Sequence, residues 1–189
     1  MPILSTLRKA PVTLAKLLVG HRLIVGYLII SLTGCTTVHI QTNVKPADKP
    51  EFRRILVVSN LPQMVPTYLA RFQTAFPSGY QVCTVSNSPI DFDGPEEAIE
   101  KQRQTCQSEV LLTIDFSRNY TSGYGKYITS NNELLLVMTN LATNKPFWKA
   151  IVTTGSSSEV PPSDIVQQLI KDGIIGGSVP AEKSYQSDY

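Results

Sequence analysis

The chain has 189 residues, and its 17 Lys and Arg against 15 Asp and Glu give a formal net charge of +2. Four of the basic residues lie within the first 34 positions, so the rest of the chain carries 13 basic and 15 acidic side chains and is slightly acidic. Binding to nucleic acid relies on Lys and Arg clustered on one face. The composition therefore predicts no nucleic-acid partner.

The first 34 residues have the organisation of a signal peptide. A basic stretch that includes Arg8 and Arg22 leads into an uncharged run of ten residues, 23–32. A helix needs about 20 apolar residues to cross a bilayer, so this run suits the core of a signal peptide. It closes on Leu32-Thr33-Gly34-Cys35, which resembles the lipobox of bacterial lipoproteins. The resemblance implies cleavage after Gly34 and a lipid anchor on Cys35.

Other interpretations of this segment fit less well. An uncleaved anchor would need a longer apolar run, and an unlipidated signal would end in an Ala-x-Ala-like site, which is missing. Several acyl chains on one cysteine would hold the chain durably at a membrane. Thr36 stands where enterobacterial lipoproteins that stay in the inner membrane have Asp. The resemblance therefore implies the periplasmic face of the outer membrane.

The rest of the chain divides into three parts. Residues 35–52 are polar, hold two prolines in their linker portion and show no sustained period, so we expect a lipidated cysteine and a flexible tether. Residues 53–175 have the apolar content of one globular domain. Residues 176–189 lose that content and predict a disordered tail.

Within the domain, apolar periodicity predicts alternating strands and helices. Short β-rich runs predict strands, and three- and four-residue apolar spacings predict helices. The predicted order begins with strand 55–58, helix 64–76, strand 80–85, helix 96–107 and strand 110–116. A hairpin of 134–141 and 147–154 and a helix over 165–171 follow. We expect an α+β fold with a single mixed sheet, the order β-α-β-α-β-β-α, and helices mainly on one face.

Two cysteines remain once Cys35 is lipidated. An even pair outside the cytoplasm predicts a disulfide between Cys83 and Cys106, and two separately buried thiols are the alternative. The helix that follows the second predicted strand runs back along it. Its end near Cys106 therefore comes close to Cys83.

Residues suited to catalysis or metal binding are few. His39 is the one histidine after the predicted cleavage site, and it lies in the expected tether, where no rigid constellation would hold it. Asp91 and Asp93 faintly resemble a calcium loop, but a helix-capping turn explains them. Asp115 follows an apolar strand. We expect no catalytic residue, no metal and no cofactor.

A tyrosine-rich segment lies between the third strand and the hairpin. Tyr120, Tyr124 and Tyr127 are interleaved with Gly123 and Gly125, a combination typical of recognition surfaces. We expect these tyrosines to bind a partner. The alternative is a long hairpin whose tyrosines shield a sheet edge.

Two further segments, NKPFWKA at 144–150 and LIKDGII at 169–175, extend the resemblance. Together with the lipobox they resemble small Gram-negative envelope lipoproteins. The implied fold is that of the amino-terminal domain of the Tol-system propeller protein and of the penicillin-binding-protein activator lipoproteins. The expected function is a non-catalytic accessory subunit that binds an envelope protein. The alternatives are a transporter auxiliary that binds a lipid or solute and a hydrolase that uses Asp91, Asp93 or Asp115.

Overall fold

A computed structural model describes residues 38–61, 66–87, 94–124, 127–155 and 159–181. The chain divides into two compact units, Met1–Cys35 and Thr36–Tyr189, and all of the described residues belong to the second. The predicted signal peptide and Cys35 therefore lie outside the described residues. Within these ranges no helix is long and apolar enough to cross a membrane.

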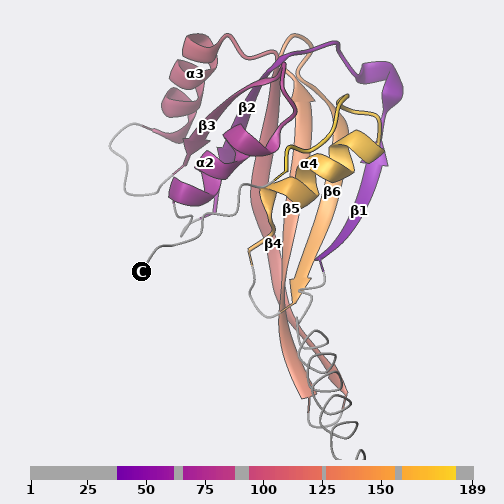
Figure 1. The fold of residues 1–189 in the computed structure, drawn as a ribbon. Helices are drawn as coiled ribbons and strands as arrows, with labels where there is room; N and C mark the ends of the chain where they lie inside the picture. Colours follow the sequence, from indigo (N-terminus) through magenta and orange to yellow (C-terminus); the bar gives the residue numbers. More distant parts are fainter. Residues whose placement is uncertain (1–37, 62–65, 88–93, 125–126, 156–158, 182–189) are drawn as a thin grey trace, which may run out of the picture. The chain divides into compact units, whose positions relative to one another are not determined.

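The second unit is built on one mixed sheet of six strands (Figure 1). The strands are β1 (Val38–Val44), β2 (Arg54–Ser59), β3 (Gln81–Ser86), β4 (Val110–Tyr124), β5 (Tyr127–Asn140) and β6 (Lys145–Gly155). Their spatial order is β1-β6-β5-β4-β2-β3. Strand β2 is parallel to β3 and β4, and the other neighbours are antiparallel. The predicted α+β class and single mixed sheet are confirmed.

Strand β1 lies in the segment predicted to be a tether. It pairs with β6 over its whole length, and Val38 lies opposite Thr154. Valine and isoleucine side chains at alternate positions pack against the core, while the intervening polar side chains, His39 among them, are exposed. The prediction of a tether over 35–52 is therefore wrong from Val38 onward. A short 3-10 helix, η1 (Pro46–Asp48), follows β1.

Of the six observed strands, β1 alone corresponds to no predicted range. Strands β4, β5 and β6 correspond to the predicted ranges 110–116, 134–141 and 147–154, which the order β-α-β-α-β-β-α counts as two strands. The remaining predicted elements correspond to observed ones, with small shifts of their ends.

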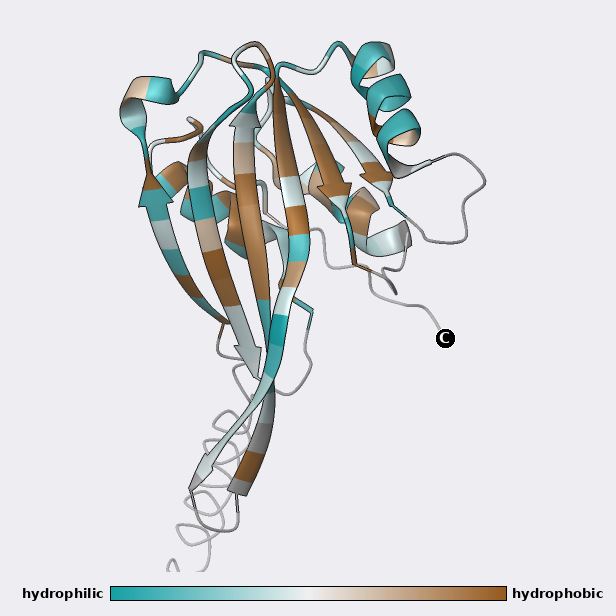
Figure 2. Ribbon diagram, turned by 180° about the vertical axis from the view of Figure 1, so that it is seen from behind, coloured by the Kyte–Doolittle hydropathy of each residue, from teal (hydrophilic) through white to brown (hydrophobic). Residues whose placement is uncertain are grey.

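Three helices connect or cover the strands: α2 (Pro66–Ala75), α3 (Pro95–Cys106) and α4 (Pro162–Lys171). Helices α2 and α4 lie side by side on one face of the sheet (Figure 1). Helix α3 lies at the opposite face. Paired residues of neighbouring strands point to the same face, and Cys83 pairs with Leu56, whose neighbour Val57 points into the core. The side chain of Cys83, which is bonded to the end of α3, therefore points away from α2 and α4. No helix of the described residues lies on the back of the sheet over β4, β5, β6 and β1 (Figure 2).

The hydrophobic core fills the space between the sheet and helices α2 and α4. Its largest buried side chains include Trp148, Phe72 and Phe147. On β2 the core-facing residues Ile55 and Val57 are fully buried. Burying one such side chain stabilises the fold by roughly 1.5–3 kcal/mol.

Cys83 on β3 and Cys106 at the end of α3 form a disulfide, as predicted. Their Cα atoms are 6.4 Å apart, within the range that a disulfide spans. The bond closes a loop of 23 residue steps that contains all of α3. It ties the helix to the edge strand of the sheet.

The two segments that carried the resemblance meet in the structure. The indole Nε1 of buried Trp148 donates a hydrogen bond to Oδ2 of Asp172 at 2.7 Å, and Nε2 of Gln168 donates to Oδ1 of the same carboxylate at 2.8 Å. Asp172 thus satisfies a buried donor and fixes the end of α4 over β6. These motif residues have a structural role.

Glu109 fastens the start of β2 to the start of β4. Its Oε2 accepts hydrogen bonds from the backbone N–H groups of Arg53 at 2.7 Å and Arg54 at 3.0 Å. Its Oε1 accepts a third from the Arg54 guanidinium at 2.8 Å. These hydrogen bonds, the two from the backbone first, lower the pKa of Glu109.

The segment predicted as a tail begins with packed residues. The backbone N–H of Gly176 donates to the hydroxyl of Tyr80 at 3.1 Å, and Val179 packs against the core. The expectation of disorder is therefore wrong for this first part. Residues 182–189 lie outside the described residues.

Candidate binding surfaces

The most prominent surface feature is a two-stranded arm formed by the far ends of β4 and β5. The predicted tyrosine-rich loop between the strands is instead a continuation of both, with Asn119 opposite Asn132 and Tyr124 opposite Tyr127. Strand β2 pairs with β4 only as far as Ile114, and β6 pairs with β5 only from Asn131 onward. Beyond these points the ribbon has no described neighbouring strand, and it projects from the sheet (Figure 1). We call residues 119–124 and 127–132 the arm, and at its base Asn131 and Asn132 still pair with Gly155 and Thr154 of β6.

The backbone register brings the three predicted tyrosine positions to one face of the arm. Positions 120 and 124 are four residues apart on β4, and Tyr127 lies directly opposite Tyr124. The side chain of Tyr120 is 36% exposed. The side chains of Tyr124 and Tyr127 lie outside the described part. On the other face of the ribbon, Ile128 is 76% exposed.

Polar side chains in the arm bond to one another across the two strands. The Nδ2 of Asn119 donates to Oδ1 of Asn132 at 2.7 Å and to Oγ of Ser130 at 3.1 Å. The Nδ2 of Asn131 donates to Oγ of Ser122 at 2.6 Å. These hydrogen bonds link the side chains of the two strands along the arm.

A charged cluster marks the base of the arm, where a register shift follows Phe116. Buried Glu133 accepts hydrogen bonds from Nη2 of Arg118 and Oγ of Ser117, both at 2.9 Å, and these bonds lower its pKa. The Arg118 guanidinium also lies over the ring of Tyr120, 5.3 Å from its centroid. The phenyl ring of Phe116 is half exposed beside this cluster.

The second surface is the outer edge of β1, which is an end strand of the sheet. The backbone N–H of Lys45 donates to the carbonyl of Phe147 at 2.8 Å. The backbone N–H and C=O groups of an antiparallel strand point alternately toward the paired strand and away from it. The N–H groups of Asn43 and Gln41 therefore also point to β6, and the N–H of Thr42 points outward. The edge therefore offers a row of backbone donors and acceptors.

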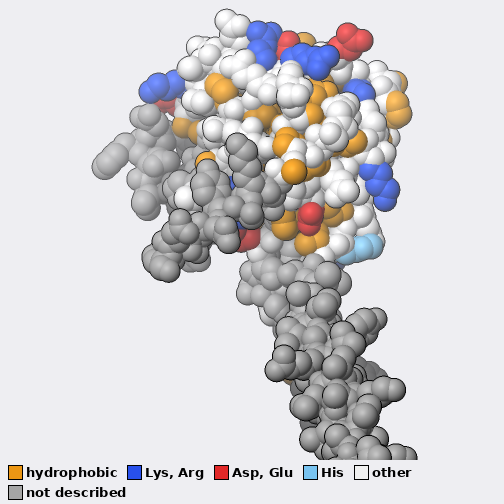
Figure 3. Space-filling view, in the orientation of Figure 1, with side chains coloured by type: hydrophobic (Ala, Val, Ile, Leu, Met, Phe, Trp, Pro, Cys, Tyr) orange, Lys and Arg blue, Asp and Glu red, His pale blue; other side chains and the backbone are white. Residues whose placement is uncertain are grey.

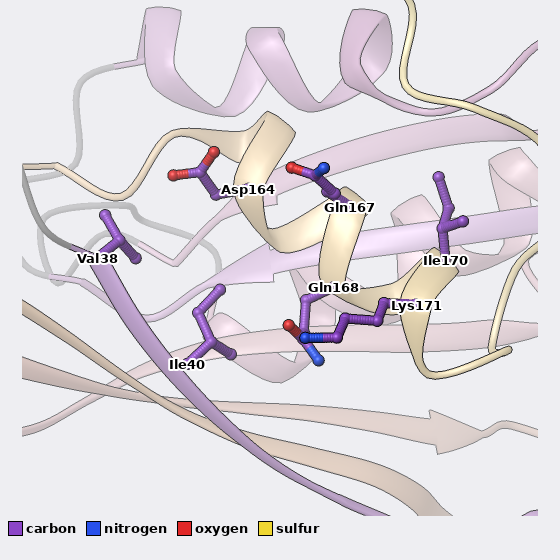
Figure 4. A pocket seen from close by; sticks show the side chains of 7 residues that line it. All are labelled: Val38, Ile40, Asp164, Gln167, Gln168, Ile170 and Lys171. Atoms are coloured by element: carbon purple, nitrogen blue, oxygen red, sulfur yellow. The ribbon is translucent and has the colours of Figure 1, made fainter. Parts of the chain in front are cut away.

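A groove lies between this edge strand and α4 (Figure 4). Its volume is about 510 Å³. Val38 and Ile40 line it from β1, and Asp164, Gln167, Gln168, Ile170 and Lys171 line it from α4. The lining is mixed, with apolar side chains on the strand and mostly polar ones on the helix.

Charged side chains are unevenly distributed. On the face drawn in Figure 3, most Lys and Arg lie at the end of the domain where η1 lies in Figure 1, and acidic side chains are interspersed among them. The arm lies at the other end, and residues 119–132 include no Asp or Glu and one Lys. The described residues contain no group of three His, Cys, Asp or Glu placed to hold a metal.

Of the residues predicted as weak candidates for chemistry, the structure describes Asp115 and His39, which lie on different strands. Asp115 on β4 accepts a hydrogen bond from Nδ2 of Asn60 at 2.6 Å and is half-buried. His39 lies on β1, with its Nε2 3.2 Å from Nε2 of Gln41. Asp91 and Asp93 lie outside the described residues. The alternation of polar and apolar side chains along β1 is the signal that could have revealed its edge as a candidate surface.

No family model and no curated protein matches the chain. Among solved structures, it is similar to a PelC dodecamer from Paraburkholderia phytofirmans, with 15% identity and a TM-score of 0.39 over 72% of this chain and 94% of that one. It is also similar to lipoprotein GNA1162 from Neisseria meningitidis, with 18% identity and a TM-score of 0.36 over 64% and 94%. Protein XCC0632 from Xanthomonas campestris has 13% identity and a TM-score of 0.29 over 74% and 93%.

Neither a Tol-system protein nor a penicillin-binding-protein activator is among these structures, so that part of the resemblance stays a prediction. At these identities and TM-scores, the similarities carry no argument about what the chain binds or where it acts.

Proposed function

We propose that the protein is a lipoprotein of the Gram-negative envelope, anchored through Cys35 to the periplasmic face of the outer membrane. In this proposal it is a non-catalytic binding subunit of an envelope assembly. The lipobox-like tetrapeptide ending at Cys35 supports the anchor. The bond between Cys83 and Cys106 supports a compartment outside the reducing cytoplasm.

The observation that carries the binding role is the outer edge of β1. Exposed edge strands usually bear Lys, Pro or a bulge that prevents pairing with another chain. The seven residues Val38–Val44 include no Lys and no Pro, and their pairing with β6 is regular. An extended segment of a partner protein can add to such an edge as a further strand. Alternate side chains of that segment would lie against the groove beside α4.

Photocrosslinking tests this role. A photoreactive amino acid at exposed Gln41 should form an adduct with an envelope protein in cells, whereas the same group at exposed Thr105 on α3 should not. Thr42→Pro removes an outward N–H but no bond to β6, so it should abolish the adduct and leave the melting temperature nearly unchanged. Thr42→Val is the matched control that keeps the N–H. An adduct that survives Thr42→Pro would contradict strand addition.

The groove itself favours a second candidate function, that of a transporter auxiliary which binds a small amphipathic lipid or solute. Its apolar wall at Val38 and Ile40 and its polar wall on α4 suit a ligand with both characters. If the groove binds a lipid or solute, Ile40→Asp should abolish copurification of that ligand and leave the photocrosslink from position 41 to an envelope protein unchanged. If Ile40→Asp abolishes the photocrosslink and has no effect on copurified lipid, the result supports a protein partner instead.

The lipid anchor has its own test. Cells supplied with a palmitate analogue should label the wild-type chain but not Cys35→Ser. Label that persists in Cys35→Ser would contradict the assignment of that residue.

A further inference from the structure

The arm projects from the end of the sheet at which strand β1 begins. Val38, the first residue of β1, is opposite Thr154, and Thr154 is in turn opposite Asn132 at the base of the arm. Strand β1 runs parallel to β5, because both are antiparallel to β6. The chain that precedes Val38 therefore enters the sheet from the side toward which the arm projects.

Covalent geometry limits how far Cys35 can be from this end. Three residue steps separate Cys35 from Val38, and three extended residues span at most about 11 Å. Five residue steps along β5 separate Asn132 from Tyr127, a length of about 17 Å at the rise of a strand. The arm is therefore longer than the chain that joins Cys35 to Val38, even at full extension of that chain.

We propose that the arm is a membrane-contacting element, whose exposed Ile128 enters the headgroup region of the bilayer that holds the lipid on Cys35. The proposal rests on the proposed lipid anchor. A short tether keeps the domain close to the bilayer that holds the lipid, and the arm projects from the end of the sheet that the tether joins.

The composition of the arm fits this location. Tyrosine is enriched at the interface between membrane and water, where its ring contacts lipid and its hydroxyl contacts water. Residues 119–132 include Tyr120, Tyr124 and Tyr127 and lack acidic residues that anionic headgroups would repel. The cross-strand bonds of Asn119 and Asn131 already satisfy side-chain groups that would otherwise lose water.

The backbone sets the depth of the contact. A two-stranded ribbon has unpaired N–H and C=O groups along its outer edges, and such groups do not enter the hydrocarbon region. The headgroup region, which still holds water, can satisfy them. An isolated ribbon of this kind is also only marginally stable in water. Contact with a lipid surface would stabilise the part of the ribbon that pairs with no other described strand.

The test uses the lipidated chain purified from membranes and reconstituted into phosphatidylethanolamine–phosphatidylglycerol vesicles. The thiol of Cys35 is blocked by lipid, and Cys83 and Cys106 are joined, so Ile128→Cys introduces a single reactive thiol for an environment-sensitive fluorophore. The matched control is Thr143→Cys, in the exposed turn between β5 and β6 at the opposite end of the sheet. Vesicles contain a phospholipid with a nitroxide at a shallow position of its acyl chain.

On vesicle-bound protein, we expect the emission of the fluorophore at position 128 to be blue-shifted and to be quenched by the nitroxide lipid. The emission of the fluorophore at position 143 should show neither change. Flotation of the vesicles reports the anchor separately. Protein that floats with the vesicles but is not quenched at position 128 would overturn the membrane contact and leave the anchor intact. Equal quenching at both positions would overturn the orientation. Protein that does not float would contradict the anchor, and with it this inference.

Discussion

Reduction of the bond between Cys83 and Cys106 should destabilise the domain by an amount that follows from the loop it closes. The sequence separation is 23 residues. In the chain-entropy description, a loop of that length restricts the unfolded chain by about 3 kcal/mol at 25 °C. For a domain of this size each kcal/mol corresponds to roughly 2–4 °C, so the melting temperature should fall by about 6–12 °C.

Urea unfolding of Cys35→Ser, which lacks the lipid, measures this difference with and without dithiothreitol. Reduction keeps both sulfur atoms in place, so it isolates the effect of the cross-link from the loss of buried sulfur. The variant with Cys83→Ala and Cys106→Ala should unfold at lower urea and should not respond to dithiothreitol. Thiols that react with an alkylating agent before reduction, or a wild-type midpoint that reduction leaves unchanged, would refute the reasoning.

Two other predictions concern carboxylates that hold distant segments together. Asp172→Ala leaves the buried Trp148 indole without its acceptor, so the free energy of unfolding should fall by about 1–3 kcal/mol; a loss within error in urea titration would contradict the structural role. Glu109→Gln should lower stability at pH 7, because the folded-state pKa of Glu109 is lowered. The difference in stability between the variant and the wild type should shrink as the pH falls from the pKa of an ordinary glutamate to the lowered pKa of Glu109 in the folded state. The exposed Glu96→Gln is the control. A loss of stability that does not depend on pH, or an equal loss in Glu96→Gln, would contradict the role of Glu109.

Local sequence signals were sufficient for most of the fold. The apolar run 55–58 lies within β2, and the periodic segment 64–76 contains α2. The prediction that Cys83 and Cys106 meet followed from the antiparallel course of the helix after its strand. These features depend on spacing over a few turns, which a single sequence displays directly.

Strand β1 was missed although its alternation is visible in the sequence. Apolar Val38 and Ile40 alternate with polar His39 and Gln41, as in a half-buried strand. The segment follows the lipobox directly and carries few apolar residues, a pattern that is typical of a linker. Its pairing with β6 joins residues more than 100 positions apart, and no local pattern specifies that.

The arm was missed for a different reason. Gly123 and Gly125 are typical of turns, and Ser, Thr and Asn fill most of the segment. Strand propensity there is weak, and cross-strand pairs such as Asn119 with Asn132 maintain the ribbon instead. The alternative of a long hairpin was nearer to the structure than a loop. Contacts between distant residues, such as Trp148 with Asp172, likewise lie beyond sequence reasoning.

The central claim is that the domain is held at a membrane by lipid on Cys35, and the mass of its first peptide tests that claim most directly. Protein extracted from bacterial membranes should yield an N-terminal peptide that begins at Cys35 and carries a diacylglyceryl group and an amide-linked acyl chain. A chain that retains residues 1–34, or that begins elsewhere with an unmodified amino terminus, would contradict the account.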